Sequence, residues 1–174
     1  MSLSQIPVAA VLGHPVSHSK SPRLHNFWLS KFGVNGFYIP LDIDPTNFEK
    51  HIRSLPRLGF VGANVTIPYK EKILKVADKI SDRAAIIGAA NTLTFLSDGK
   101  IYADNTDGYG FIQNIKSQYK DWTAKDGMSV VFGAGGASRA ILGALIEDGA
   151  SEICLLYTSP SPRDLSTSRM PSSA

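Results

Sequence analysis

The sequence contains a single cysteine, Cys154, and no apolar run long enough to cross a bilayer. One cysteine cannot form an internal disulfide, so we expect a reducing, cytoplasmic location. The longest apolar runs, such as AAIIGAA, fall far short of the roughly 20 residues that a membrane-spanning helix needs. No signal peptide opens the chain. We therefore expect no membrane partner.

An excess of one charge sign is also missing. The chain has 18 Lys and Arg against 15 Asp and Glu, a net charge of +3. The pI near 9.0 would suit nucleic acid, but the basic residues are scattered and no nucleic-acid-binding motif appears. We expect no nucleic-acid partner, only a weak preference for anionic small molecules. His14, His18 and His25 lie near no cluster of carboxylates or cysteines, so no metal site is predicted.

Apolar residues make up 43% of the 174 residues, which is enough for a real core. Apolar runs near residues 7–13, 37–43 and 59–66 predict three strands, separated by segments with helical spacing. Ser21 and Pro22 form a typical helix start, with Ser21 as the N-cap. After the third strand, two short helices are expected between Tyr69 and Ala89, and then a hairpin around Asp98-Gly99. A further helix and then strand, helix and strand over residues 128–156 complete the order. This alternation predicts an α/β fold whose last part begins a fresh βαβ unit.

A glycine-rich loop, VVFGAGGASRA, follows an apolar strand and opens a helix. The small residues would let the backbone approach a pyrophosphate at the positive end of that helix. The acid that usually holds the ribose of NAD is absent from Ile153 to Pro162. A carboxylate there would repel a 2′-phosphate, so its absence favours NADP over NAD. The loop residues are Gly133, Ala134, Gly135, Gly136 and Ala137.

Hydroxyl and amide side chains gather in four short stretches of the first 107 residues. Such groups, with one lysine and one aspartate, suit a small polyhydroxylated acid, because they can bind a carboxylate and ring hydroxyls. Each residue also has a structural interpretation: Ser21 and Asp107 as helix caps, and Lys70 as a solvated surface residue. The stretches are SHSKSP, NVTIPYK, AANT and DNTDG.

Five motifs, in order along the chain, resemble the shikimate dehydrogenase family: GHPVSHSKSP, GANVTIPYK, GAANT, DNTDG and GAGGASRA. The resemblance covers about residues 6–154. It implies an N-terminal three-layer α/β substrate domain followed by the start of a Rossmann-like dinucleotide-binding domain. It also implies reversible, NADP-linked reduction of 3-dehydroshikimate to shikimate, a step of chorismate and aromatic amino-acid biosynthesis.

The resemblance assigns roles residue by residue. Lys70 falls on the catalytic lysine, and Asp107 would hold it and help relay the proton. Asp82 falls where the family often has an acid near the cofactor, and residues 133–137 fall on the phosphate loop. The substrate positions are Ser19, Lys20, Ser21, Asn64, Thr66, Asn91 and Asp107.

The resemblance also divides the chain into three parts. Residues 1–105 would form the substrate-binding catalytic domain, and residues 106–154 a partial NADP-binding domain. Residues 155–174, of which eleven are Ser, Thr or Pro, are expected to be a disordered or artefactual tail. The basic motif that the family places after the second strand of its cofactor domain is absent. We therefore expect a C-terminally truncated fragment with weak or no activity.

Two further functions are alternatives to this one. One is a quinate/shikimate dehydrogenase that uses NAD or NADP. The other is a non-catalytic, shikimate-binding remnant of the same fold. A homodimer is likewise an open alternative to a monomer.

Overall fold

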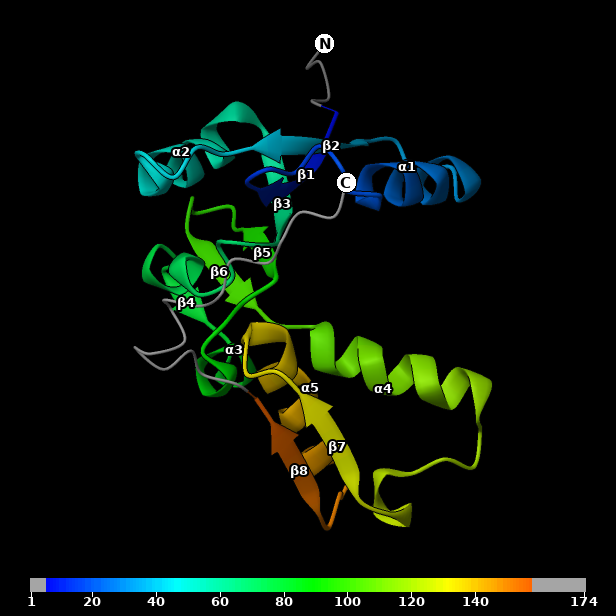
Figure 1. The fold of residues 1–174 in the computed structure, drawn as a ribbon. Helices are drawn as coiled ribbons and strands as arrows, with labels where there is room; N and C mark the ends of the chain where they lie inside the picture. The colour runs from blue at the N-terminus through cyan, green and yellow to red at the C-terminus, as the bar shows by residue number, and fades with distance from the viewer. Residues whose placement is uncertain (1–5, 158–174) are drawn as a thin grey trace, which may run out of the picture.

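The structure, a computed structural model, describes residues 6–157, which form two α/β units in chain order (Figure 1). The strands are β1 (Val8–Gly13), β2 (Phe37–Asp42), β3 (Phe60–Val65), β4 (Lys79–Ile80), β5 (Thr92–Phe95), β6 (Ile101–Asp104), β7 (Ser129–Phe132) and β8 (Ile153–Leu156). The helices are α1 (Ser21–Lys31), α2 (Phe48–Ser54), α3 (Asp82–Ile87), α4 (Asp107–Gln118) and α5 (Gly136–Glu147). Short 3₁₀ turns are η1 (Pro56–Leu58), η2 (Lys72–Lys75) and η3 (Ala124–Asp126).

The first unit is built on a six-stranded mixed sheet in the order β2-β1-β3-β5-β6-β4. Strand β1 pairs in parallel with both β2 and β3, whereas β5 runs antiparallel to β3 and β6. The carboxyl ends of β1, β3 and β6 and the start of β5 therefore meet at one edge of the sheet. This edge receives the loops that carry the predicted polar residues.

One face of the sheet is covered by α2, η1, η2 and α3, and it holds the main core. Ile52 of α2 and Leu12 of β1 are fully buried there. The ring of Phe48 stacks on that of Tyr69, with 4.3 Å between ring centroids, and the Tyr69 hydroxyl donates to the Ile43 carbonyl. Because Tyr69 is completely buried, it anchors the loop after β3, in which Lys70 is the next residue.

Helix α1 lies on the opposite face of β1–β3 from α2 (Figure 1). The three-layer α/β arrangement predicted from the sequence is thus confirmed. Helix α1 covers a smaller buried cluster than the helices on the other face. Among the described residues this cluster consists of Val11, Val16 and Tyr38, and Leu29 of α1 packs against it. A groove of about 500 Å³ stays open between α1 and the sheet. Its apolar walls include the exposed side chains of Trp28, Phe32, Val34, Phe37 and Val61.

The second unit is the predicted βαβ unit, in which β7 and β8 pair in parallel and α5 connects them. Helix α4 leads from the first unit and packs against α5. A Cβ atom at Gly108 would clash with the Ala140 carbonyl, so the bare glycine permits this close crossing. Ala140 also joins Ile87 and Ala89 in a small buried cluster that links the units.

Three local expectations differ from the structure. Helix α1 begins at Ser21, with Lys20 at the N-cap position and no side-chain capping bond, so the N-cap prediction for Ser21 is wrong. The first of the two short helices expected after residue 69 is the 3₁₀ turn η2. Leu155 and Leu156, assigned to the tail, belong to β8. Residues 158–174, the rest of that tail, lie outside the described residues.

Within residues 6–157 no helix is long and apolar enough to cross a bilayer. The same stretch contains no group of three or more His, Cys, Asp or Glu side chains that could hold a metal ion.

Candidate active site at the sheet edge

Lys70 and Asp107 meet at the sheet edge although 37 residues separate them in the sequence. The Lys70 Nζ atom lies 2.5 Å from Asp107 Oδ2. The side chains are 21% and 27% exposed, so the pair is accessible but shielded on most sides. Asp107 is the first residue of α4, and Thr106 takes the N-cap position before it. Asp107 is therefore not the N-cap of α4, and Lys70 is not a fully solvated surface lysine.

Asn91 fixes the second oxygen of this carboxylate. Its Nδ2 atom donates to Asp107 Oδ1 over 2.7 Å, while its Oδ1 atom accepts from the Thr106 N–H over 2.9 Å. Its backbone bridges two strands, since the Val65 N–H donates to the Asn91 carbonyl over 2.8 Å and the Asn91 N–H donates to the Asp104 carbonyl. Asp107 is thus oriented at both oxygens by groups held in the sheet.

Asn64 and Thr66 come from the end of β3, beside Asn91. Asn64 Oδ1 accepts from the Tyr38 hydroxyl over 2.7 Å, and Asn64 Nδ2 donates to the Asn91 carbonyl over 3.3 Å. The Thr66 N–H donates to the Leu12 carbonyl, which ties the loop after β3 to β1. A Cβ atom at Gly13 would lie 2.7 Å from Thr66 Cγ2, so a larger residue there would displace Thr66.

The loop after β1 brings Ser19 and Ser21 to the same edge, both half-buried, with Lys20 exposed between them. Because Ser21 does not cap α1, its hydroxyl is free of that role. His14 and Asp42 hold the start of the loop: the His14 ring lies 2.6 Å from Asp42 Oδ1, and the Val16 N–H donates to Oδ2. The hydrogen bond with His14 keeps the pKa of the Asp42 carboxyl below its ordinary value.

Asp104, the last residue of β6, stabilises the segment that leads to Asp107. Burial raises the pKa of this carboxyl, but hydrogen bonds from Ser81, Arg83 and the Asn105 N–H outweigh burial and leave the pKa below its ordinary value. Asn105 is 1% exposed, donates to the Ala89 carbonyl and accepts from the Asp107 N–H over 3.0 Å. Asn105, counted among the polar candidates, therefore fixes the start of α4 from inside.

The glycine-rich loop lies between β7 and α5, away from these side chains in the sequence. Gly133 has a φ of +98°, which residues with a side chain rarely adopt. Gly135 is the N-cap of α5 and offers no side-chain acceptor to the first N–H groups of the helix. Gly136 lies against the first unit, since a Cβ atom there would be 3.1 Å from that of Ala89. The loop, in which Ala134, Gly135 and Ala137 are exposed, fits a phosphate group bound by backbone N–H groups.

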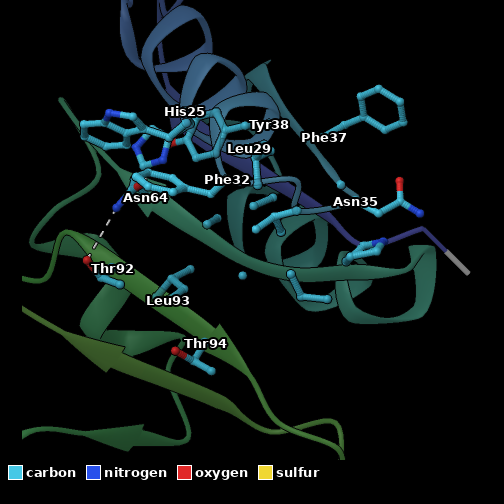
Figure 2. A pocket seen from close by; sticks show the side chains of 18 residues that line it. His25, Leu29, Phe32, Asn35, Phe37, Tyr38, Asn64, Thr92, Leu93 and Thr94 are labelled. Atoms are coloured by element: carbon cyan, nitrogen blue, oxygen red, sulfur yellow. Dashed lines mark hydrogen bonds between the residues drawn. The ribbon is translucent and has the colours of Figure 1, made fainter.

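The structure does not bring every predicted residue into one cluster. Asp82 is exposed at the first turn of α3 and belongs to none of the hydrogen bonds described above. Conversely, Tyr38 was missed from the sequence, and Thr92, the last residue of the AANT stretch, was given no role, although both contact Asn64. Figure 2 shows Asn64 and Thr92 joined by a hydrogen bond, with Tyr38 nearby. Nothing local in the sequence signals the contact of Tyr38, because Tyr38 lies two strands away from Asn64.

The sequence of this chain is similar to those of known shikimate dehydrogenases. A family model for the shikimate dehydrogenase substrate binding domain matches residues 11–93. The shikimate dehydrogenase (NADP(+)) of Roseobacter denitrificans is 56% identical over 155 residues, which are 89% of this chain and 56% of that protein. The chain thus spans about half the length of the curated relatives it matches.

Solved structures show the same fold. The shikimate dehydrogenase of Aquifex aeolicus has a TM-score of 0.83 at 37% identity, covering 92% of this chain and 59% of that chain. The shikimate 5-dehydrogenase of Thermus thermophilus, in complex with NADP(H) and shikimate, has a TM-score of 0.80 at 37% identity and covers 91% and 58%. From the matched substrate binding domain and these relatives, we conclude that the chain is similar to shikimate dehydrogenases over most of its own length.

Proposed function

We propose that this chain carries the substrate site and the acid–base pair of an NADP-dependent shikimate dehydrogenase, which reversibly reduces 3-dehydroshikimate to shikimate. The observation that carries the proposal is the Lys70–Asp107 pair, 2.5 Å apart at the edge that also receives Asn64, Asn91 and the serine loop. The Roseobacter denitrificans relative is named as an NADP(+) enzyme, and the Thermus thermophilus relative is solved with NADP(H) and shikimate.

Lys70 acts as the proton donor in the direction of reduction. When NADPH is bound, it supplies the hydride that reduces the ketone carbon. Negative charge then develops on the carbonyl oxygen, and the Lys70 ammonium stabilises it and gives up a proton. In the oxidative direction the neutral amine accepts the hydroxyl proton. A positioned acid–base group of this kind contributes about 10²–10⁴-fold in rate.

Asp107 keeps the amine at the reacting oxygen. Its Oδ2 atom accepts from Lys70 while Oδ1 accepts from Asn91, so the carboxylate cannot rotate without losing a hydrogen bond. Asp107 thus positions Lys70 and compensates its charge within the half-buried site.

The remaining polar side chains bind the substrate. Ser19 and Ser21 would bind the carboxylate, with Lys20 flanking them on the exposed side of the loop. Asn64, Thr66 and Asn91 would bind ring hydroxyls, since amides and hydroxyls both donate and accept. Residues 1–105 supply all of these side chains, so we assign substrate binding to that part of the chain.

Residues 106–154 would hold the pyrophosphate of the cofactor. The first N–H groups of α5 and the partly exposed loop before and at its start suit that group; the loop residues are Gly133, Ala134, Gly135, Gly136 and Ala137. Asp82 would lie on the cofactor side of the same site. NADP rather than NAD is favoured because no acid follows β8 in the sequence up to Pro162. The homodimer and the cytoplasmic location stay predictions.

Shikimate binding to the 174-residue chain tests the proposal. We expect a saturable change of tryptophan fluorescence, because Trp28 lies in the groove that also includes Asn64. Lys70→Ala should weaken binding, whereas Lys72→Ala, an exposed neighbour on η2, should leave it unchanged. Absence of any shikimate binding would overturn the proposed function.

A parallel assay of NADP⁺ reduction separates the enzyme from the alternatives. We expect binding with little or no turnover, because the unit that carries the glycine-rich loop has only two strands within residues 6–157. Weak turnover that rises with chain concentration would identify the enzyme, whereas binding without any turnover fits both an inactive fragment and the non-catalytic remnant. Equal binding of quinate and shikimate would instead favour the broader dehydrogenase.

A further inference from the structure

We propose that Tyr38 and Thr92 are positioning residues that join Asn64 to the Asn91–Asp107–Lys70 cluster in one directed chain of hydrogen bonds. The proposal rests on the proposed function for its effect on substrate binding. The chain runs from the groove under α1 to the ion pair, over four strands and the start of α4.

The direction of the chain is set at its charged end. A carboxylate can only accept hydrogen bonds, so the amide N–H of Asn91 must face Asp107 Oδ1, 2.7 Å away. The Asn91 Oδ1 atom then faces the Thr92 hydroxyl, which donates to it over 2.9 Å. A hydroxyl has one proton, so Thr92 must act as an acceptor toward any other partner.

Asn64 completes the chain with a matching polarity. Its Nδ2 atom points at the Thr92 hydroxyl, at 3.5 Å, and at the Asn91 carbonyl, at 3.3 Å. Its Oδ1 atom therefore faces the other way and accepts from the Tyr38 hydroxyl over 2.7 Å. Each donor in the chain points to the next residue on the way to Asp107. The side-chain amides of Asn64 and Asn91 can therefore each take only one of their two flipped orientations.

Tyr38 is a rigid anchor for this end. It is 5% exposed, and its ring stacks on that of His25 with 4.1 Å between centroids and 6° between planes. Its backbone N–H and carbonyl are both bound by the side chain of Asn26 on α1. Burial raises the pKa of the hydroxyl to about 12, so it remains a donor at any pH at which the site works. Figure 2 shows Tyr38, Asn64 and Thr92 along the groove.

Removing the hydroxyl of Thr92 or Tyr38 should release the amide of Asn64. Thr92→Val keeps the shape of the side chain but breaks the chain at its centre, and we expect about a 10-fold weaker shikimate affinity. Tyr38→Phe removes the anchor and should weaken affinity about 5-fold. Thr92→Ser restores the hydroxyl and should bind with about the affinity of the unchanged protein.

Matched controls separate positioning from general damage. Thr94 lies on the same strand, lines the same groove and is exposed, so Thr94→Val should leave affinity unchanged. Tyr109, exposed on α4, gives the corresponding control Tyr109→Phe. The melting temperatures of all variants are measured beside the titrations.

A second measurement on the unliganded chain does not depend on the proposed function. In ¹⁵N NMR spectra, Tyr38→Phe should shift the side-chain NH₂ signals of both Asn64 and Asn91. The Tyr38 hydroxyl contacts Asn64 directly and is linked to Asn91 only through Asn64, so a shift at Asn91 reports the connected chain. Unchanged Asn91 signals would overturn the proposal, and so would equal losses of affinity in Thr92→Val and Thr94→Val. A chain that binds no shikimate but shows the NMR shift would refute the proposed function and keep the hydrogen-bond chain.

Discussion

The two units of this chain bury their apolar side chains to different degrees. In the six-stranded unit, one sheet face packs under α2 and α3, and Ile52, Leu12 and Tyr69 are fully buried. In the two-stranded unit, Val131 faces α5, but Val130 and Phe132, which alternate with it on β7, are exposed. The first unit therefore has a closed core on one side, whereas β7 has only one covered face.

This difference matters for function because each unit carries a different task. The Lys70–Asp107 pair and its amide partners are fixed by a buried core and by backbone bonds between strands. The glycine-rich loop depends on a sheet of two strands, and small sheets of this kind are marginal by themselves. We infer that substrate binding is the more robust property of the chain and cofactor binding the weaker one.

The largest effect is expected from Lys70→Ala in a chimera. The chimera joins residues 1–127 to the corresponding remainder of the Roseobacter denitrificans enzyme, which supplies a complete second half. If the first unit holds the chemistry, Lys70→Ala should lower kcat about 10²–10⁴-fold with a smaller change in KM, because the proton transfer occurs in the transition state. Steady-state NADP⁺ reduction measures both constants.

Lys72→Ala in the same chimera is the control, since this exposed lysine is two residues from Lys70. Retention of kcat in Lys70→Ala, with only KM raised, would remove Lys70 from acid–base catalysis. That result would also contradict the assignment of the catalytic chemistry to the first unit.

A pair of substitutions tests the difference in packing directly. Ile52 is 0% exposed and Phe132 is 76% exposed. Ile52→Ala should therefore reduce the free energy of unfolding by about 2–5 kcal/mol. Phe132→Ala should change it by less than about 0.5 kcal/mol. Urea unfolding followed by circular dichroism measures both, and a large loss in Phe132→Ala would show that this face of β7 is covered in solution.

The order of elements could be predicted from the sequence because the signals are local. Apolar runs mark β2 and β3, a glycine-rich loop marks the turn from β7 to α5, and Asp98-Gly99 marks the β5–β6 hairpin. The convergence of Lys70, Asn91 and Asp107 came from the motifs in their family order, not from periodicity. The structure then gave a physical reason: all three follow or precede strand ends at one sheet edge.

The contacts of Tyr38 could not be predicted, because they depend on sheet register. On β1, Tyr38 has Ala9 as its neighbour and Asn64 has Val11, so their meeting requires a phenol that reaches across a whole strand. The prediction of Ser21 as the N-cap of α1 was wrong for a different reason. Local propensity favours a cap at a serine before a proline, but α1 begins one residue earlier than that rule requires.

The smallest expected effect concerns the serine loop of the first unit, which is held by the exposed interaction between His14 and Asp42. The His14 ring holds the pKa of Asp42 below its ordinary value, so the folded carboxyl loses its proton at lower pH than the unfolded one. Its stabilisation is present above the unfolded pKa, about 3.9, and is lost as pH falls through the lower folded pKa. In NMR titrations, His14→Ala should raise the midpoint of Asp42, and the Ser19 N–H signal should move with it. An unchanged midpoint in His14→Ala would show that the Val16 N–H alone holds the carboxylate, and that His14 does not support the loop.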